Sequence, residues 1–273
     1  LNILFIHEVD WLRKVVFEIH TLAEYLSLLG HKVYAIDYES MWVKKGPFDL
    51  LKSKETINVA RVYPEAPVCL IRPCFIKISV LSRITAFFSH YFQIKKTIKE
   101  KHIDAIVLYS VPTNGLQTLY LAKKYGIPVV FRALDILNQM VRYRVLRLPT
   151  RLLETKVYSG ADLILTLSPE LSDYVIKLGA SDSKVGLLPL GVDIRQFHPS
   201  IDSSDLKKKW KIKEDESVIM FIGTLFDFSG MDGFLYYLPD IKKEVPGAKL
   251  LIVGDGPQRP KLENIIRELL RKR

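Results

Sequence analysis

The sequence predicts an α/β protein with two successive Rossmann-like domains, of which the first is complete and the second holds only its opening βα units. Short β-rich apolar runs alternate with segments of helical periodicity, which is the pattern of parallel βα units. A polar stretch rich in Lys, Asp and Ser interrupts that alternation, and a second βα series follows it. These changes predict domains at residues 1–197 and 217–273, joined by a linker at 198–216.

The first domain opens with a strand at Asn2–Ile6 and a helix that begins near Lys14 and ends at Gly30. One face of this helix is apolar and includes Val15, Ile19, Leu22, Ala23, Leu26 and Leu29. Further strands are expected at Lys32–Ile36, Ile57–Val62, Ala105–Tyr109, Pro128–Arg132, Leu163–Leu167 and Lys184–Leu188. Helical segments are expected at Ser79–Lys101, at Thr113–Tyr125, before Gly160 and after the N-cap residue Ser168.

The second series contains two βα units. Its strands are expected at Ser217–Ile222 and Lys249–Val253, and its helices at Met231–Val245 and Pro260–Arg271. Two such units rarely cover both faces of a parallel sheet. We therefore expect the chain to contain only the beginning of this domain.

Composition narrows the class of protein. Of the 273 residues, 48% are hydrophobic, and no apolar run reaches the ~18–20 residues of a membrane-spanning helix. The first residues, Leu1–Ile6, lack a basic start, so we interpret them as a core strand rather than a signal peptide. Cys69 and Cys74 are too few for a disulfide framework or a zinc site, and we expect a cytoplasmic protein without a metal.

The net charge of +10 indicates an anionic partner. Basic and apolar residues interleave in two stretches, 72–101 and 142–151. Their cations are Arg72, Lys77, Arg83, Lys95, Lys96, Lys99, Lys101, Arg142, Arg144, Arg147 and Arg151. Amphipathic basic helices favour an anionic bilayer surface, and a packed helix with a solvated basic face remains the alternative. The sequence contains no recognisable RNA- or DNA-binding motif, so nucleic acid is not an expected partner.

Short motifs follow one another in a fixed order in the second half of the chain. They are the Ala-Asp strand ending in Ser at Gly160–Ser168, the Gly-Val-Asp turn at Pro189–Asp193, the strand ending in Gly at Phe221–Leu225 and the Gly-Asp-Gly-Pro turn within Leu250–Pro257. Each alone is weak, because a turn of the last kind is more often structural than ligand-binding. All four in this order and spacing are much more specific. The junction Gly30–Val33 adds to them.

With these motifs the sequence resembles glycosyltransferase family 4, the retaining nucleotide-sugar transferases of the GT-B fold. The resemblance covers essentially the whole chain and is strongest from Gly160 to Leu262. It implies a GT-B-like fold with an acceptor-side first domain and a donor-side second domain, and a nucleotide-diphosphate sugar as donor substrate without a further cofactor. It also implies that the acidic pair that contacts the donor lies about 70–90 residues past Gly256, so the chain alone is expected to be inactive.

The resemblance also implies a donor site. Glycine-rich loops and helix N-termini of such enzymes let backbone N–H groups approach the donor diphosphate. The matching positions are Gly223, Thr224, Ser229, Gly230 and Gly254. The family usually has Arg at the position of Thr224 and Lys at that of Ser229, so this loop lacks its cations. Arg13 and Lys14 replace a Gly pair in the first loop; they are candidates for neutralising the diphosphate, or solvated residues at a helix start, and both interpretations stay open.

On the acceptor side, the family often has a His before the Asp that follows the fourth or fifth strand. Here the pair is Leu134–Asp135, so Asp135 alone is the candidate catalytic residue. Candidate acceptor contacts lie at strand ends, where open α/β sheets place ligands. They are Glu8, Asp10, Trp11 and Arg132. Ordinary loop roles for these residues, including an Arg132–Asp135 pair, remain the alternatives.

These observations favour a glycosyltransferase that moves a sugar from a nucleotide-diphosphate donor to a lipid-linked or glycan acceptor with retention of configuration. We expect it in the cytoplasm, peripherally attached to the inner face of the membrane. The alternative is a non-catalytic basic Rossmann-like module that binds an anionic membrane or a protein partner. The missing cations of the donor loop favour that alternative.

Overall fold

The computed structural model describes residues 1–38, 54–76, 81–141 and 143–271. Its contacts divide the chain into two compact units, residues 1–191 and 192–273. The division follows Gly191 within the Gly-Val-Asp turn, slightly before the expected end of the first domain at residue 197. The expected domain and linker bounds remain predictions.

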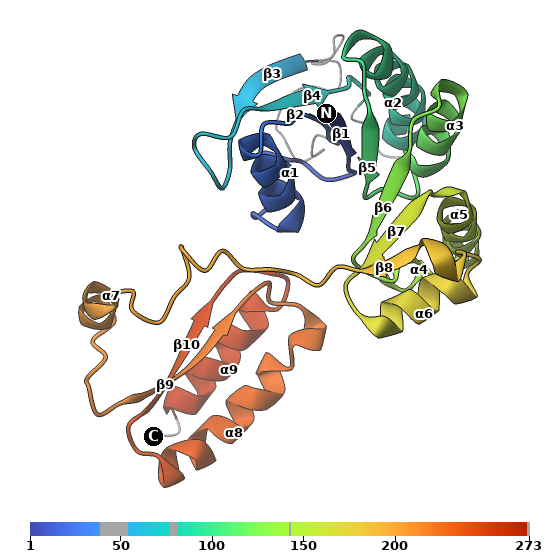
Figure 1. Ribbon diagram of the computed structural model, residues 1–273. Coiled ribbons are helices and arrows are strands. Elements are labelled where there is room, and N and C mark those ends of the chain that lie inside the picture. Colours follow the sequence, from blue (N-terminus) through green and yellow to red (C-terminus); the bar gives the residue numbers. More distant parts are fainter. Residues whose placement is uncertain (39–53, 77–80, 142, 272–273) are drawn as a thin grey trace. The chain divides into compact units, whose positions relative to one another are not determined.

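The first unit is built on an eight-stranded sheet with the order β3-β4-β2-β1-β5-β6-β7-β8 (Figure 1). Its strands are β1 (Asn2–Ile6), β2 (Lys32–Ile36), β3 (Lys54–Val59), β4 (Val68–Arg72), β5 (Ala105–Leu108), β6 (Val129–Ala133), β7 (Leu163–Thr166) and β8 (Val185–Leu187). Neighbouring strands are parallel except β3 and β4, which pair antiparallel at the edge. The expected α/β class with a parallel sheet is thus confirmed.

Helices pack on both faces of this sheet. They are α1 (Glu18–Leu28), α2 (Leu81–Glu100), α3 (Gly115–Tyr125), α4 (Leu137–Met140), α5 (Arg147–Gly160) and α6 (Pro169–Lys177), with the 3-10 turns η1 (Arg144–Leu146) and η2 (Asp182–Lys184). On one face, Ile19 of α1 shares a core with Ile3 and Phe5 of β1. On the other face, residues of α2, α3, α5 and α6 share a core with Leu4 and Ile6. Successive side chains of a strand point to opposite faces, so one strand serves both cores.

The expected strand at Ile57–Val62 is wrong in its position, and one strand was not predicted. The structure places β3 at Lys54–Val59 and β4 at Val68–Arg72. Most β3 side chains are exposed at the sheet edge, so they do not show the apolar alternation of a half-buried strand. β4 is buried, but its apolar run is short and lies between Pro67 and Pro73.

The expected start of the first helix is also wrong. α1 begins at Glu18, and Val15 and Leu29, which were expected on its buried face, are exposed. The segment before Glu18 forms a loop because distant side chains bond its main-chain groups. The other expected helices and strands of this unit are confirmed, with small differences at their ends.

The second unit contains the two-stranded parallel sheet of β9 (Ser217–Ile222) and β10 (Ala248–Val253). Its helices are α7 (Ser204–Lys209), α8 (Met231–Glu244) and α9 (Arg259–Arg271), with the 3-10 turn η3 (Asp227–Ser229). Its core consists of Leu225, Met231, Leu235, Leu262 and Ile265. Val218, Met220 and Ile222 alternate along β9 and are exposed, so one face of this small sheet is uncovered. Short helix α7 lies within the stretch expected to be a linker.

Candidate functional site

The candidate site of the first unit lies at the carboxyl ends of its parallel strands. The sheet order brings the loops after β1, β2, β4 and β5 to one edge. A polar or charged residue lies at each of these strand ends. They are Asp10 after β1, Asp37 after β2, Arg72 at the end of β4 and Ser110 after β5. This edge is therefore a layer of polar groups rather than an extension of the apolar core.

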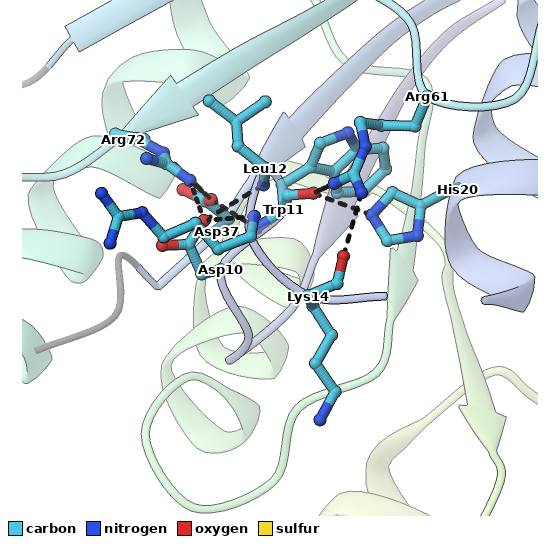
Figure 2. A network of polar contacts seen from close by, with 9 residues as sticks. Asp10, Trp11, Leu12, Lys14, His20, Asp37, Arg61 and Arg72 are labelled. Carbon is cyan, nitrogen blue, oxygen red and sulfur yellow. Dashed lines mark hydrogen bonds and ion pairs between the residues drawn. The ribbon is translucent and has the colours of Figure 1, made fainter. Parts of the chain in front are cut away.

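One guanidinium links three of these loops (Figure 2). Arg72 donates from Nε and Nη2 to Asp37 Oδ2, at 3.1 and 2.7 Å, and from Nη2 to Asp10 Oδ1. The Trp11 N–H donates to the same Asp37 oxygen at 2.8 Å. The Asp37 side chain is completely buried, and burial raises the pKa of its carboxyl to about 6, although Arg72 opposes the rise.

The carbonyls of the loop after β1 are held by Arg61, which follows β3. Its guanidinium donates to the carbonyl oxygen of Trp11 and, at 3.0 Å, to that of Lys14. Arg61 is in turn fixed by Glu24 of α1, whose buried carboxylate accepts the Arg61 N–H at 2.6 Å. The same carboxylate accepts the N–H groups of the next two residues at 2.8 Å each. The buried carboxylate of Glu24 thereby positions Arg61, whose guanidinium holds the loop after β1.

Other groups of this loop are also bonded. Asp10 Oδ1 accepts the N–H groups of Leu12 and Arg13 at 3.1 Å each, as in an Asx turn. His20 Nε2 lies 3.0 Å from the Trp11 carbonyl, and it is the donor because a carbonyl oxygen can only accept. Burial lowers the pKa of His20, which favours its neutral ring. The main chain of the loop is thus held by side chains of the protein itself.

Arg13 and Lys14 are exposed residues on this fixed loop. Within the described ranges, their side chains form no hydrogen bond or ion pair, and Figure 2 shows the Lys14 side chain directed away from the network. An anion can therefore approach these cations without breaking an internal ion pair. This geometry fits a phosphate-neutralising role, which remains a prediction.

Glu8, an expected acceptor contact, is engaged at the start of α3. Its carboxylate accepts the N–H groups of Thr113 and Asn114, at 2.5 and 3.1 Å, and the hydroxyl of Ser110. Arg83 of α2 donates to its other oxygen at 3.0 Å. α3 has no acidic residue in its first turn, so Glu8 supplies the negative charge that a helix N-terminus favours.

The other expected acceptor contacts, Asp10, Trp11 and Arg132, are buried. Asp10 belongs to the network of Figure 2, and Trp11 is only 2% exposed. The Arg132 side chain has no exposed surface; it donates to Glu18 at 2.7 Å and to the Leu165 carbonyl at 3.1 Å. These residues support the edge of the sheet from within, and a direct contact with an acceptor remains a prediction for each.

Asp135, the candidate catalytic residue, is exposed and follows β6. An Arg132–Asp135 pair is not the one that forms, because Arg132 bonds Glu18 of α1. In the part of the chain that the structure describes, no group forms a hydrogen bond with the Asp135 side chain. Its carboxylate is therefore open to solvent at the carboxyl edge of the sheet.

Sequence analysis did not identify Asp37, Arg61 or Glu24 as site-forming residues, and it assigned Arg72 only to a basic stretch. A usable signal exists for Asp37 and Arg72, since each ends an apolar strand run at the edge where ligands bind. No such signal exists for Arg61 and Glu24. They meet across 37 residues of chain, and only the fold brings them together.

In the second unit, the loops after β9 and β10 bond to each other. The Gly223 N–H donates to the Val253 carbonyl and the Leu225 N–H to the Asp255 carbonyl, both at 3.0 Å. A Cβ atom on Gly254 would lie 1.9 Å from the carbonyl oxygen of Gly223. Packing alone therefore requires glycine at this position, and its expected contact with a donor remains a prediction.

The expected donor loop runs from Gly223 to Gly230 and leads into α8. Thr224 and Gly230 are exposed and Ser229 is half-buried. Gly230 has a φ of 68°, which glycine adopts without strain, and it is the N-cap of α8. The loop thus ends at the N-terminus of a helix, where the Asp232 carboxylate accepts the Gly233 N–H at 2.9 Å, and the loop carries no cation.

No membrane span or metal site emerges from the described ranges. None of their helices is both long enough and apolar enough to cross a bilayer. Nor do three or more His, Cys, Asp or Glu side chains gather there in a metal-binding arrangement. Cys69 and Cys74 are both free thiols, and burial raises the pKa of Cys69 to about 12.

Two family models match the chain, one in each unit. Residues 18–196 match the model described as Glycosyltransferase Family 4, and residues 202–272 match the one described as Glycosyl transferases group 1. The first match alone covers more than half of the chain. Both agree with the resemblance that the motifs indicate.

Solved structures share the fold. Sucrose-phosphate synthase from Thermosynechococcus elongatus superposes with a TM-score of 0.68 at 17% identity, over 98% of this chain and 67% of that one. Anabaena Alr3699/HepE in complex with UDP and glucose gives a TM-score of 0.65 at 14% identity, over 99% and 66%. These similarities confirm the expected GT-B-like fold class.

Curated relatives are longer than this chain. The alpha-monoglucosyldiacylglycerol synthase of Acholeplasma laidlawii is 24% identical over 267 residues, which are 92% of this chain and 62% of that protein. The UDP-Gal:alpha-D-GlcNAc-diphosphoundecaprenol alpha-1,3-galactosyltransferase of Escherichia coli is 25% identical over 187 residues, 66% of this chain and 46% of that protein. The chain thus spans less than two thirds of the length of either relative. On the match of its first unit, the chain belongs to glycosyltransferase family 4.

Proposed function

We propose that the protein containing this chain moves a sugar from a nucleotide-diphosphate donor to a lipid-linked or glycan acceptor, with retention of configuration. Family membership supports the reaction class. The names of the two relatives support the acceptor class, since one names a glucosyldiacylglycerol and the other a diphosphoundecaprenol-linked sugar. In this proposal the chain supplies the acceptor side and the phosphate-binding part of the donor side, and it does not turn over alone.

The single observation that carries the donor assignment is the fixed loop after β1. Transfer leaves a nucleotide diphosphate, on which negative charge develops as the sugar departs. Cations that are already in place stabilise such charge without reorganisation. The main chain that bears Arg13 and Lys14 meets this condition, because Arg61 and Arg72 hold it, and the exposed side chains of both residues can reach an anion.

The donor loop of the second unit is a further candidate for phosphate binding. Gly230 is the N-cap of α8 and carries no side chain, and a helix N-terminus favours an anion. Thr224 and Ser229 offer hydroxyl donors in place of the cations usual at these positions. Gly223 and Gly254 let the two loops approach each other closely.

On the acceptor side, the exposed carboxylate of Asp135 accepts a hydrogen bond from the acceptor hydroxyl in this proposal and orients it for attack. An open carboxylate at the carboxyl edge of the sheet supports this role. Glu8, Asp10, Trp11 and Arg132 act beneath the site, because each is buried or already bonded. No metal ion takes part in the proposed reaction.

The second part of the proposal is peripheral attachment to the anionic cytoplasmic face of a membrane. Support comes from the exposed cations Arg83, Arg144, Arg147 and Arg151, which lie among exposed apolar side chains. Two residues of the expected basic stretches, Lys77 and Arg142, lie outside the described residues. A bilayer that carries the acceptor would bring the enzyme to its substrate.

A non-catalytic basic module is the other candidate, and the absence of a cation from the stretch 223–230 favours it. Transfer of labelled sugar separates the two. The full-length protein is incubated with a panel of nucleotide sugars and a bacterial lipid extract, and lipid-bound label is counted. We expect transfer from at least one donor, with the anomeric configuration of the product, read by NMR, equal to that of the donor. Membrane binding without transfer from any donor would instead establish the module.

A further inference from the structure

Three helices on one face of the sheet of the first unit carry exposed apolar side chains, and these side chains lie mostly toward the helix starts. α2, α3 and α5 pack side by side on the same face of the sheet (Figure 1). Their exposed large apolar residues are Leu81, Ile84, Phe87, Phe88 and Phe92 of α2, Leu116 and Tyr120 of α3, and Leu148 and Leu152 of α5. Phe92 and Tyr120 lie near the middle of their helices, and the others lie in the N-terminal half of theirs. Val145 and Leu146 of η1, directly before α5, are exposed as well.

The arginines and the lysines of these helices lie toward opposite helix ends. The arginines, Arg83, Arg144, Arg147 and Arg151, lie at the helix starts among the apolar residues. The lysines, Lys95, Lys96, Lys99, Lys123, Lys124 and Lys156, lie in the C-terminal halves. Helices that connect parallel strands start at the carboxyl edge of the sheet and run back to the opposite edge. The arginine and apolar end is therefore the end that borders the candidate site.

The starts of α2 and α5 extend past the start of α3. A Cβ atom on Gly115, the first residue of α3, would touch Val157, and Gly160 meets Leu119 in the same way. The two helices thus run in the same direction, and the ten residues of α5 that precede Val157 add about 15 Å beyond α3. On the other side, Tyr91 lies against Tyr120, so the start of α2 also extends past α3.

Nothing in the described chain accounts for the arginines around the start of α5, whereas Arg83 of α2 pairs with Glu8. A positive charge near a helix N-terminus is electrostatically unfavourable, and neither α2 nor α5 has an acid in its first turn. Within the described part of the chain, the guanidinium groups of Arg144, Arg147 and Arg151 form no ion pair or hydrogen bond. Leu146, Leu148 and Leu152, which neighbour these arginines in the sequence, are exposed as well. An anionic, partly apolar surface outside the protein satisfies both.

We propose that these projecting helix starts, residues 81–92 and 144–152, form a docking edge that inserts into an anionic bilayer and turns the carboxyl edge of the sheet toward it. The inference rests on the membrane part of the proposed function and adds an orientation to it. Arginine suits this position because its stem lies along apolar groups while its head stays at the lipid phosphates. A second copy of the chain is a poorer occupant, since two such edges would repel each other.

Arg83 connects the docking edge to the site. It lies in the first turn of α2, beside Ile84, and its Nη1 donates to Glu8 at 3.0 Å and to Thr113 Oγ1 at 2.8 Å. Both partners lie at strand ends of the carboxyl edge. A bilayer against the docking edge would therefore present its headgroups next to the site that handles a lipid-linked acceptor.

Two variants with equal charge loss test this orientation in the full-length protein. One carries Arg144→Gln, Arg147→Gln and Arg151→Gln, and the other Lys95→Gln, Lys96→Gln and Lys99→Gln. Binding to phosphatidylcholine vesicles with and without phosphatidylglycerol is measured by co-sedimentation. At a typical contribution per cation, we expect the arginine variant to bind the anionic vesicles roughly 10- to 100-fold more weakly, and the lysine variant less than about threefold. Equal losses, or a larger loss in the lysine variant, would overturn the proposed orientation.

A second pair tests insertion of the apolar side chains. Phe88→Ser removes an exposed ring of the docking edge, and Tyr237→Ser removes an exposed ring of α8 as a control. We expect weaker vesicle binding only for Phe88→Ser, with unchanged circular dichroism in both variants. Equal binding by the two variants, or a wild type that ignores anionic vesicles, would refute the docking edge. Sugar transfer to a detergent-solubilised acceptor is measured separately, so failure of the docking edge and failure of the transferase proposal are distinguishable.

Discussion

Arg72 and Asp37 form an ion pair with a distance of 2.7 Å between Nη2 and Oδ2, and this pair joins the carboxyl ends of β4 and β2. The same guanidinium bonds Asp10, which follows β1. The sheet order β4-β2-β1 makes these three strand ends neighbours. The loop that bears Arg13 and Lys14 is therefore tied to the sheet itself, and its conformation does not depend on a ligand.

Removing this guanidinium should destabilise the first unit. In Arg72→Met, the completely buried Asp37 loses its cation, and breaking a buried pair in this way costs about 3–5 kcal/mol. Urea unfolding measures the free energy of unfolding, and hydrogen exchange reports the N–H groups of Trp11, Leu12 and Arg13, which should exchange faster. Arg259→Met, at an exposed helix position, is the control and should leave both readouts unchanged.

The destabilisation by Arg72→Met should also depend on pH in a defined direction. A folded-state pKa of about 6 for Asp37, above its ordinary value of 3.8, means that the folded protein binds this proton more tightly. A protonated carboxyl needs no cation. The difference in unfolding free energy between variant and wild type should therefore be largest above pH 6 and shrink toward pH 4. A difference that grows on acidification would contradict this role of the pair.

His90 should contribute to loss of stability in acid. Its ring is fully buried beside Tyr38 and Phe75, and burial lowers its pKa from 6.5 to about 4. The stabilisation that depends on its neutral form is present above pH 6.5 and lost as pH falls toward 4. Between pH 6.5 and pH 4, the free energy of unfolding of His90→Leu should therefore fall by up to about 3 kcal/mol less than that of the wild type.

Thermal or urea unfolding between pH 4 and pH 6.5 measures the slope of the free energy of unfolding against pH for the His90 variant. His198→Leu, at an exposed position, is the matched control for replacing a His by Leu. The buried His7, whose pKa is also lowered to about 4 by burial, keeps part of the acid sensitivity in both variants. An unchanged slope in His90→Leu would show that this ring does not titrate as burial implies.

Two glycines of the second unit should respond oppositely to alanine. A Cβ on Gly254 would lie 1.9 Å from the Gly223 carbonyl oxygen, which belongs to the backbone of the adjoining loop. Overpacking of this severity should cost about 3 kcal/mol or more. Gly233, inside α8, has nothing within 4 Å of the added carbon, so Gly233→Ala should stabilise by about 0.5–1 kcal/mol. Chemical unfolding of both variants checks the prediction; a harmless Gly254→Ala would mean that the two loops do not approach as described.

Much of the fold was predictable because it depends on local patterns. Apolar runs of β1, β5 and β6 and helical periodicity of α2 are buried as their sequences indicate. Edge strand β3 was misplaced because most of its side chains are exposed. Strand β4 was not predicted because a short apolar run between prolines gives little signal. The start of α1 was predicted wrongly because its position depends on distant groups, among them Arg61 and Asp37.

The location of the candidate site could be predicted from the sequence, but the contacts of its side chains could not. Parallel topology puts the loop after β1 at a ligand-binding edge, so Glu8, Asp10 and Trp11 were identifiable from position, and Arg13 and Lys14 from the family resemblance. Which of them face solvent depends on partners far along the chain. Glu8 bonds residues about a hundred positions away, and Arg132 finds Glu18 rather than its neighbour Asp135. Such pairings are set by tertiary structure, which sequence patterns do not encode.

The most direct test of the account is calorimetric titration of the full-length protein with a panel of nucleotide-diphosphate sugars. We predict that at least one binds with a stoichiometry of one, and that combining Arg13→Ala with Lys14→Ala weakens it about tenfold or more, since two charge-assisted contacts to the diphosphate are lost. Lys123→Ala with Lys124→Ala, which removes two lysines from the last turn of α3, should bind like the wild type. The account is contradicted if no nucleotide sugar binds, or if both double variants bind as tightly as the wild type.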